Sequence, residues 1–444
     1  MIPDVLVLGA GPAGCVVSRR LAKAGARVML VGAAARPGWE GLSARSQALL
    51  TEEGAGTDAH AGGDAFSSVI AGPFPRGGVW ADRAVEGFEW LVERRQLAKS
   101  LRSEALSAGV DYRFDAVTHA VCSAGLWRVR LHSGGRLEAP VLVDARGRRG
   151  AERRGPVLLA LGQTFRRQRS AASGTEIRAF DAGWCWWATR GRALWVQVVS
   201  RPHSRHPAGW IAAAAAQVPA LAQALEGATP DGDAVARPAH ARLGIARHLG
   251  LATHDSTPWR VGDAALALDP LSGQGVYEAL RGAGLVATAI QSVLNGGDAE
   301  IAHRFVSDRQ VEAWIRGVRV AAGFYREYGE RSDFWARTAE GYEQLLADAA
   351  PVALGTLRRA VLHDGRILER EVIVTADHPR GVWQVDGVPL VPLKGYLESA
   401  KHSTVAGAAE ALEKPEAAVA AAIHWLQRTG VVSVQFRQRD SSGG

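Results

Sequence analysis

The sequence predicts a mixed α/β (α+β) protein, in which a Rossmann-like dinucleotide-binding domain is interleaved with a β-sheet domain and followed by a small winged-helix-like domain. Three observations support this class: a strand, glycine turn and helix that open the chain, a second glycine-rich loop near residue 262, and alternating apolar and polar runs between them. At 444 residues the chain is too long for one hydrophobic core. We therefore expect a composite domain over residues 1–350, with its β-sheet part at about 155–260, and a second domain over residues 351–444.

The start of the chain has a dinucleotide-binding pattern. The apolar strand Val5–Leu8 runs into a G-x-G-x-x-G turn, which is followed by a helix up to Ala24 and by a second apolar strand, Arg27–Val31. In such a turn the first glycine closes the bend, the second admits a pyrophosphate, and the third lets helix and strand pack closely. The predicted loop contains Gly9, Gly11, Pro12, Ala13 and Gly14.

A second ligand-binding loop is predicted within Val261–Leu280. A buried strand leads to Gly262 and Asp263, and a helix begins directly after the glycines of the loop that follows. Glycines let the backbone contact a ligand, and the N–H groups and dipole of a helix start favour a phosphate or an electron-rich ring edge. Taken alone, such a loop can also serve only to close a turn. The candidate contact residues are Asp263, Pro270, Gly273, Gln274 and Gly275.

Together the two loops resemble those of the flavin-dependent monooxygenase and halogenase superfamily, and the resemblance spans Ile2 to Ala350. It implies one non-covalent FAD, with its ADP half in the first loop and its ribityl chain and isoalloxazine ring at the second. It also implies contacts from a helix that starts at Gly41–Arg45, from an arginine before the helix Gln96–Ala108, and from a residue near the adenine. These three residues are Arg45, Arg94 (preferred to Arg95, with a solvated surface arginine as the alternative) and Val117.

One position departs from the pattern of this superfamily. Its second strand usually ends in an acidic residue that binds the ribose hydroxyls of adenosine, whereas this chain has Gly32. The departure implies weaker FAD binding or a substitute ligand from a nearby residue. If the missing acid is a real deficit, the substitution Gly32→Glu should strengthen FAD binding.

A tryptophan-rich strand near residue 185 is a candidate wall of the active site. On a strand, Trp184 and Trp186 face one side while Cys185 and Trp187 face the other. The alternative is plain core packing of a sheet against helices. The W-x-W spacing is similar to a halogenase signature, although the isoleucine and proline that follow it in halogenases are absent. Trp184 and Trp186, with Pro270 of the late loop, are the candidate catalytic residues.

The lysine distribution bears on the reaction that the resemblance implies. Halogenases of this superfamily use an active-site lysine, but Lys23 and Lys99 are the only lysines before residue 394, and neither is expected near the flavin. We therefore expect hydroxylation of an aromatic substrate through a flavin hydroperoxide, with molecular oxygen and NADH or NADPH as co-substrates. The sequence has no second G-x-G-x-x-G for NAD(P)H, no metal-ligand spacing and no nucleophile motif.

The extension after Pro351 bears on the substrate. Helices predicted at Ser403–Leu412 and Glu416–Thr429, followed by a strand at Val431–Phe436, resemble a winged-helix module whose charges are balanced rather than basic. The extension, the late loop and the missing lysine resemble flavoproteins that hydroxylate a tryptophan within another polypeptide during tryptophylquinone biogenesis. The alternatives are a small-molecule aromatic hydroxylase or tryptophan-halogenase-like enzyme of secondary metabolism, and a flavin-binding DNA regulator.

Composition indicates where the protein works and what it contacts. The chain enters a strand at once, without a signal peptide, and no apolar run is long enough to span a bilayer. Three widely spaced cysteines suit reduced thiols. The net charge of +7 comes mostly from arginine, in no compact basic tract. We expect a cytoplasmic enzyme that binds neither membranes nor nucleic acid, with a peptide or small protein as its substrate.

Overall fold

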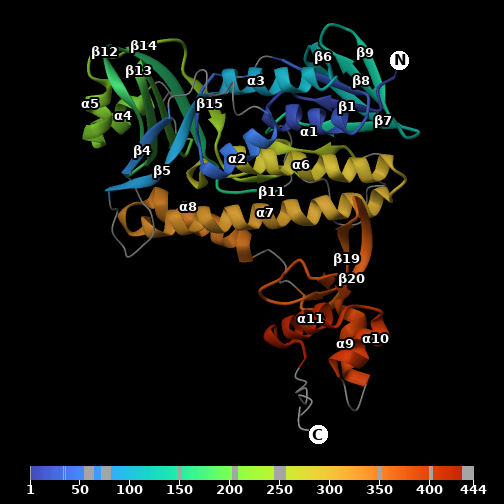
Figure 1. The fold of residues 1–444 in the computed structure, drawn as a ribbon. Coiled ribbons are helices and arrows are strands. Elements are labelled where there is room, and N and C mark those ends of the chain that lie inside the picture. Colours follow the sequence, from blue (N-terminus) through green and yellow to red (C-terminus); the bar gives the residue numbers. More distant parts are fainter. Residues whose placement is uncertain are drawn as a thin grey trace. The chain divides into compact units, whose positions relative to one another are not determined.

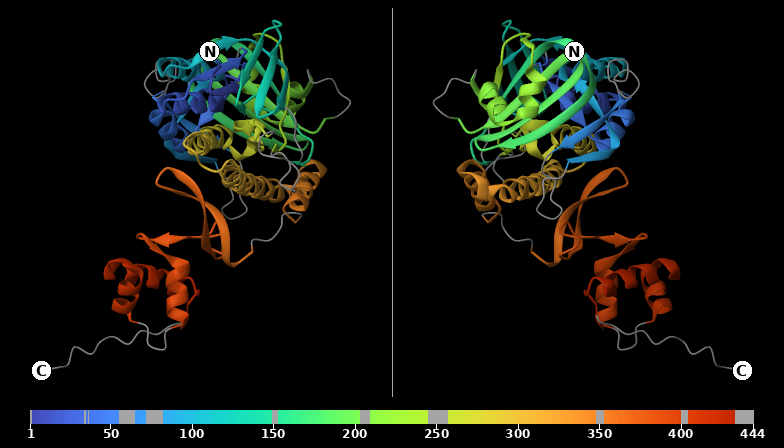
Figure 2. Two further views of the ribbon diagram at one scale, coloured as in Figure 1. Left: turned by 90° about the vertical axis from the view of Figure 1, so that its right-hand side faces the viewer. Right: turned by 90° about the vertical axis from the view of Figure 1, so that its left-hand side faces the viewer.

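The computed structural model describes residues 2–33, 35, 37–54, 65–71, 82–148, 153–202, 209–244, 257–347, 353–399 and 404–432. The chain forms two compact units (Figures 1 and 2). The first comprises Met1–Gln291 and Val306–Ala349, and the second comprises Ser292–Phe305 and Ala350–Gly444. In the described part of the chain, no helix is long and apolar enough to cross a membrane.

The first unit is centred on a five-stranded parallel sheet with the strand order β17-β10-β1-β2-β6. All four residues of the central strand are buried, as parallel strands are when both faces of the sheet are covered. Helix α1 (Pro12–Lys23) connects the first two strands. The strands are β1 (Val5–Leu8), β2 (Val28–Gly32), β6 (Asp111–Phe114), β10 (Val141–Asp144) and β17 (Trp259–Arg260).

An antiparallel meander of β7 (Val117–Ser123), β8 (Leu126–Leu131) and β9 (Arg136–Ala139) is inserted between β6 and β10. The alternating pattern between residues 110 and 143 predicts one meander. Its two ends instead form β6 and β10 of the parallel sheet. Residues Asp111–Phe114 pair with β2 and residues Val141–Asp144 pair with β1, so neither segment pairs with the meander.

A second antiparallel sheet contains the two longest strands, β12 (Leu159–Phe180) and β13 (Gly183–Ser200), with β14 (Thr229–Pro230) and β15 (Val235–Pro238) on the other side of β12. In Figure 2 these green strands lie beside the blue N-terminal elements in both views. Two helices, α4 (Trp210–Gln217) and α5 (Pro219–Leu225), pack on one face. The sequence predicts a single helix here, but Pro219 has no N–H group and starts a new helix.

A third sheet of the first unit has the order β3-β5-β4. Its strands are β3 (Trp39–Leu42), β4 (Ala65–Ala71) and β5 (Asp82–Glu93), and its helices are α2 (Ala44–Glu52) and α3 (Arg94–Ser107). The helix predicted to start at Gly41 therefore begins later. Gly41 and Leu42 pair with β5, and Ser43 caps the helix by accepting a hydrogen bond from Ser46 N.

The late part of the first unit is mostly helical. Short segments η4 (Gly262–Ala264), β18 (Leu266–Ala267) and η5 (Pro270–Ser272) lead into α6 (Gly275–Leu294). They are followed by α7 (Ala299–Glu327), η6 (Gly329–Arg331) and α8 (Asp333–Ala347). Strand β18 joins β16 (Arg242–Leu243) and β11 (Arg153–Arg154) in a small sheet. The predicted mixed α/β class, with parallel and separate antiparallel sheets, is thus confirmed.

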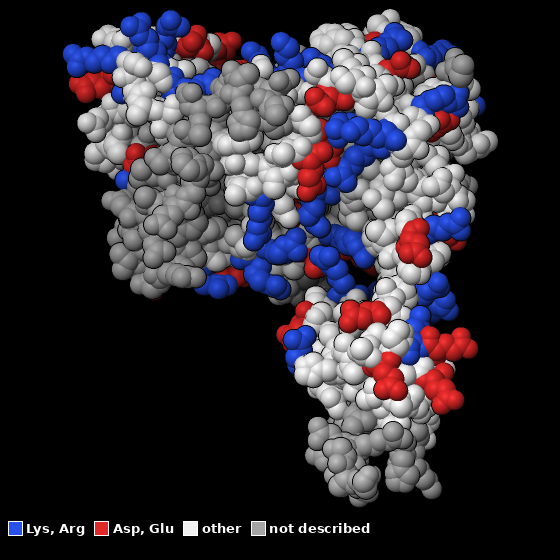
Figure 3. All heavy atoms as spheres, viewed as in Figure 1, with Lys and Arg blue, Asp and Glu red and all other residues white. Residues whose placement is uncertain are grey.

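The second unit combines a hairpin with three helices around its own core. Its strands are β19 (Gly355–His363), β20 (Arg366–Val374), β21 (Gln384–Val385) and β22 (Val388–Pro389), and its helices are α9 (Leu390–Ser399), α10 (Val405–Leu412) and α11 (Glu416–Arg428). The two predicted helices are α10 and α11. Most of the strand predicted after them, from residue 433 onward, lies outside the described residues. Figure 3 shows basic and acidic side chains intermixed over this unit.

Candidate functional site

The first glycine loop is packed as its spacing predicts. Gly9 has φ = +112°, and a Cβ atom there would lie 2.3 Å from the carbonyl oxygen of Ala145. A Cβ atom on Gly14 would lie 1.9 Å from the carbonyl oxygen of Gly9. Backbone atoms cause both clashes, so no rotamer change of a neighbour can relieve them.

The start of α1 is open where a pyrophosphate is expected. Gly11 is the N-cap residue, no side chain caps the helix, and its first turn has no acidic residue. A Cβ atom on Gly11 would have no neighbour within 4 Å. Pro12 has no N–H group, so the free N–H of Ala13 and the positive end of the helix dipole lie beside open space that suits an anion.

Gly32 is a glycine for a packing reason. A Cβ atom on it would lie 2.5 Å from the backbone nitrogen of Ala10 and 2.6 Å from the Cβ of Ala10. Its carbonyl oxygen also accepts a hydrogen bond from the hydroxyl of Tyr112 at 2.9 Å. The end of β2 therefore has no room for a side chain, which argues against the expectation that glutamate at this position strengthens FAD binding.

The second glycine loop lies against the first. A Cβ atom on Gly262 would lie 2.9 Å from the Cβ of Ala13, so η4 packs on the first turn of α1. The fold thus brings together two segments from opposite ends of the composite domain. One extended dinucleotide can contact both loops in this arrangement.

Arg148 connects the second loop to its surroundings. Its Nε donates to Oδ2 of Asp263 at 3.0 Å, and its Nη1 donates to the carbonyl oxygens of Pro238 at 2.9 Å and His240 at 3.1 Å. Its Nη2 donates to the carbonyl oxygen of Leu268 at 3.1 Å. The local sequence pattern predicts no role for this arginine, because its four partners are 90 or more residues away in the sequence.

The late loop presents backbone to solvent. Pro270 and Gln274 are half-buried, whereas Gly273 and Gly275 are exposed. A Cβ atom on either glycine would meet nothing within 4 Å. Because α6 begins at Gly275, the loop offers the free N–H groups of a second helix start, as predicted from the sequence.

A buried carboxylate precedes this loop, and sequence reasoning missed it. Asp269 is 1% exposed, and its Oδ1 accepts from the backbone N–H of Leu271 at 2.9 Å. Its Oδ2 accepts from the hydroxyl of Tyr342 at 2.7 Å and from that of Tyr325 at 3.1 Å. Nothing in the local sequence pattern indicates that tyrosines from α7 and α8 meet an aspartate before η5.

The other predicted FAD contacts lie on separate elements. Arg45 is exposed in the first turn of α2, and Val117 is half-buried at the start of β7. Arg94 begins α3, and its Nε donates to the carboxylate of Glu40 on β3. The neighbouring Arg95 is exposed and donates to the carbonyl oxygen of Ala35 at 3.4 Å. A pyrophosphate that binds Arg94 therefore has to share this arginine with Glu40 or displace Glu40 from it.

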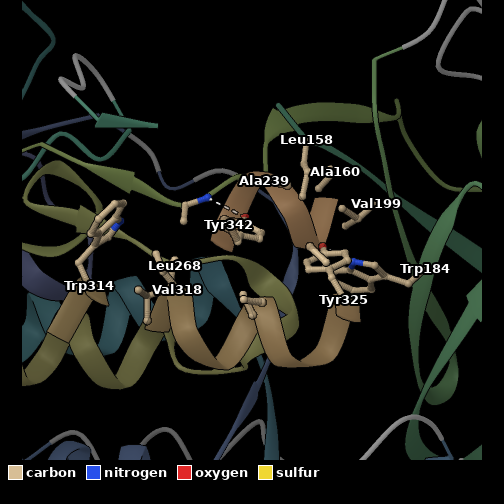
Figure 4. Packing of buried hydrophobic residues seen from close by; sticks show 14 of the residues in the cluster. Leu158, Ala160, Trp184, Val199, Ala239, Leu268, Trp314, Val318, Tyr325 and Tyr342 are labelled. Atoms are coloured by element: carbon tan, nitrogen blue, oxygen red, sulfur yellow. Dashed lines mark hydrogen bonds between the residues drawn. The ribbon is translucent and has the colours of Figure 1, made fainter. Parts of the chain in front are cut away.

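Strand β13 places its tryptophans on alternate faces, as predicted. Trp184 belongs to a core cluster that includes residues of α7 and α8, and Trp186 packs against the same cluster. Cys185 and Trp187 lie in the cluster formed with α4 and α5. Trp184 is 2% exposed, and its Nε1 donates to the hydroxyl of Tyr325 at 3.1 Å (Figure 4). Trp184 is therefore a core residue, whereas Trp186 is only half-buried.

The remaining reactive groups are exposed or inert. Lys23 and Lys99 are exposed on α1 and α3. Burial raises the pKa of the thiols of Cys15 and Cys185 to about 12, which keeps them protonated and unreactive. Among the described residues, no group of three or more His, Cys, Asp or Glu side chains could hold a metal ion.

The chain is similar to solved flavoenzymes over nearly its whole length. It matches the peptidyl tryptophan dihydroxylase QhpG, essential for tryptophylquinone cofactor biogenesis, with a TM-score of 0.80 and 28% sequence identity, over 97% of this chain and 100% of that one. The chain is a flavin-dependent monooxygenase with the fold of flavin-dependent halogenases and hydroxylases. The fold and the enzyme class predicted from the resemblance of the two glycine loops are thus confirmed.

Other comparisons agree with this fold. The flavoprotein matches CmlS, a flavin-dependent halogenase, with a TM-score of 0.66 and 16% identity over 99% of both chains. It matches the flavin-dependent brominase Bmp2 with a TM-score of 0.60 and 19% identity, over 78% of this chain and 91% of that one. The family model described as lycopene cyclase protein matches residues 4–172, which include the first glycine loop. No curated protein sequence matches the chain.

The loops of this flavoprotein fit FAD. The open space at Gly11 and the uncapped start of α1 suit its pyrophosphate, and the exposed glycines at the start of α6 suit its ring edge. Asp263 lies between these two regions, held by Arg148. The residues that would hold FAD are therefore Gly11, Ala13, Asp263, Gly273 and Gly275.

Proposed function

We propose that this flavoprotein uses NAD(P)H and oxygen to hydroxylate a tryptophan side chain carried by a peptide or small protein, in the biogenesis of a tryptophylquinone cofactor. The observation that carries this proposal is the likeness to QhpG, which extends over all of that chain and has the highest sequence identity of the similarities described above. The other matches, at 16% and 19% identity, support the fold alone.

The overall reaction defines what the protein must supply. The substrate C–H bond, O₂, NAD(P)H and one proton give a C–OH bond, NAD(P)⁺ and water, and reduced FAD supplies the activation of oxygen. The chain has to bind the cofactor, exclude water and orient an indole. An indole is electron-rich, so its oxygenation needs no strong base. Asp269, at 1% exposure and bonded by two tyrosines, is not available to act as one.

The strand beside the late loop suits an aromatic substrate. Trp186 is half-buried on the face of β13 that packs toward α7 and α8, and Pro270 is half-buried at the start of η5. Both offer apolar surface that can pack against an indole ring. In this proposal they orient the substrate, and Trp184 supports Trp186 from the core.

The positions of the lysines favour oxygenation over halogenation. Lys23 and Lys99 lie exposed on helices α1 and α3, neither of which contributes to the late loop. In halogenases of this superfamily a lysine at the active site serves the halogenation step. We therefore propose that oxygen is delivered directly to the substrate and that no halide is required.

The second unit is proposed to bind the polypeptide outside the flavin site. It contains an open pocket of about 490 Å³, formed mainly by the ends of β19 and β20 together with Lys394 and residues after α11. Leu354, at the edge of this pocket, is 63% exposed. An exposed apolar residue beside the ends of two strands suits an extended peptide segment.

Mass spectrometry tests the proposal. Purified protein with FAD, NADH or NADPH and oxygen is incubated with candidate polypeptides and, separately, with free tryptophan and indole. A gain of one or two oxygen atoms on a tryptophan of a polypeptide supports the proposal. Oxygenation of free small molecules alone replaces it with a small-molecule hydroxylase, and a halide-dependent product replaces it with a halogenase.

A further inference from the structure

A buried hydrogen-bond network connects strand β13 to the late loop. The indole N–H of Trp184 donates to the hydroxyl of Tyr325 at 3.1 Å, and that hydroxyl donates to Oδ2 of Asp269 at 3.1 Å. The hydroxyl of Tyr342 donates to the same oxygen at 2.7 Å and accepts from the backbone N–H of Ala241 at 3.3 Å. Figure 4 shows the two tyrosines between Leu268 and Trp184.

The network joins five segments of the first unit. Trp184 comes from β13, Tyr325 from α7 and Tyr342 from α8, while Ala241 precedes β16. Asp269 directly precedes η5, and its Oδ1 accepts the first N–H inside that turn. A carboxylate accepts hydrogen bonds along defined lone-pair directions. Donors from three sides therefore fix the position of the Asp269 side chain.

The burial of Asp269 makes these bonds necessary. Desolvation raises the pKa of this carboxyl, while the hydrogen bonds from Tyr342, Leu271 and Tyr325 oppose the rise. Burial, together with the charge of Asp269, raises the pKa of both tyrosines well above the usual value, so both remain donors. Removing one donor leaves part of a buried carboxylate unsatisfied, and such a group is costly unless the loop moves.

We propose that Asp269 is a positioning residue, which holds the flavin-contact loop Pro270–Gly275 in a fixed place relative to the tryptophan strand β13. This inference rests on the proposed contact of that loop with FAD, but not on the identity of the substrate. Tyr325 links β13 to Asp269, because its hydroxyl bonds both Trp184 and Asp269. Tyr342 links α8 to Asp269 directly. The ring edge of the flavin and the aromatic substrate are thereby held in one geometry.

The test uses the full-length protein and FAD alone. Tyr325→Phe and Tyr342→Phe each remove one hydroxyl and keep the ring in the core, and Asp269→Asn removes the charge at nearly constant volume. Tyr328→Phe is the matched control, since Tyr328 belongs to the same aromatic cluster, with its ring 4.8 Å from that of Trp335. FAD affinity is measured by titration of the apoprotein, and the visible absorption bands of the bound flavin report its surroundings.

The expected result is a rise of about tenfold in the Kd for FAD in each of the three network variants, because each loses a hydrogen bond to a charged group. The flavin bands should shift in the same variants, and Tyr328→Phe should match the wild type. If Tyr342 acts through Asp269, adding Tyr342→Phe to Asp269→Asn should increase the Kd no further.

Two outcomes would overturn the inference. One is wild-type FAD affinity and flavin bands in Tyr325→Phe and Tyr342→Phe, with only the melting temperature lowered, which would make the network core packing. The other is a loss of FAD affinity in the Asp269→Asn, Tyr342→Phe double variant that equals the sum of the losses in the two single variants, expressed as binding free energies. Neither depends on the substrate, so failure of tryptophan hydroxylation leaves this test intact. If the wild-type protein binds no FAD, the flavin assignment itself fails.

Discussion

The Cβ position of Gly32 lies 2.5 Å from the backbone nitrogen of Ala10. Any residue larger than glycine at the end of β2 must push the first glycine loop away from the sheet. Gly32→Ala should therefore destabilise the protein by about 1–3 kcal/mol and lower its FAD content, and Gly32→Glu should do so more strongly. Thermal unfolding of the apoprotein and FAD titration check this. Tighter FAD binding by Gly32→Glu would mean that the loop can move without cost.

Gly11 and Gly14 should respond differently to substitution. A Cβ atom at Gly11 meets nothing within 4 Å, whereas one at Gly14 lies 1.9 Å from a backbone oxygen. Gly11→Val should leave the melting temperature of the apoprotein nearly unchanged and abolish FAD binding, because it fills the proposed pyrophosphate space. Gly14→Val should impair both folding and FAD binding. Recovery of a folded Gly14→Val protein with full flavin content would remove the FAD assignment of this loop.

Arg148 should be required for FAD binding through Asp263. Arg148→Met keeps much of the side-chain length but loses the ion pair and the three bonds to backbone carbonyls. The Kd for FAD should rise about tenfold or more. Arg178→Met is a useful control, because Arg178 pairs with Glu176 on β12, outside either loop. Equal FAD affinity in the two variants contradicts the role given to Arg148.

The halogenase alternative is tested at Lys99. Lys99→Ala should keep FAD binding and turnover within about twofold of the wild type, since exposed substitutions away from a site have small effects. Product formation should be the same with and without added chloride or bromide. Loss of all activity in Lys99→Ala with flavin still bound, or a halogenated product, would show that the reaction is not simple oxygenation.

Binding of the polypeptide by the second unit is tested at the pocket rim. Leu354→Asp should raise the KM for a polypeptide substrate roughly five- to tenfold and leave FAD binding and uncoupled NAD(P)H oxidation unchanged. Leu362→Asp is the matched control, because Leu362 is 45% exposed on the same hairpin and does not line the pocket. Equal KM values for the two variants argue against docking at this pocket.

The parts of the site that could be predicted from the sequence are local ones. The spacing of Gly9, Gly11 and Gly14 indicates a turn whose function depends on backbone alone, and the alternation at Trp184 and Trp186 follows from strand geometry. These features need no knowledge of distant residues. The contact of Gly32 with Ala10, in contrast, depends on how β2 and the first loop approach each other. The local sequence therefore did not indicate why this position is a glycine.

The long-range partners could not be predicted. Tyr325 and Tyr342 lie 56 and 73 residues from Asp269, and no periodicity indicates that helices α7 and α8 converge on it. Glu40 reaches Arg94 only because β3 pairs with β5. Side-chain bonds of this kind are set by tertiary packing rather than by local pattern.

The proposed reaction of this flavoprotein is the oxygenation of a tryptophan within a polypeptide. The most direct measurement is tandem mass spectrometry of a tryptophan-containing polypeptide substrate after incubation with the enzyme, FAD, NAD(P)H and ¹⁸O₂. We expect one or two ¹⁸O atoms located on a single tryptophan, in a reaction that needs both oxygen and NAD(P)H. Unmodified polypeptide beside oxygenated free indole or free tryptophan, under conditions in which NAD(P)H is consumed, would contradict it.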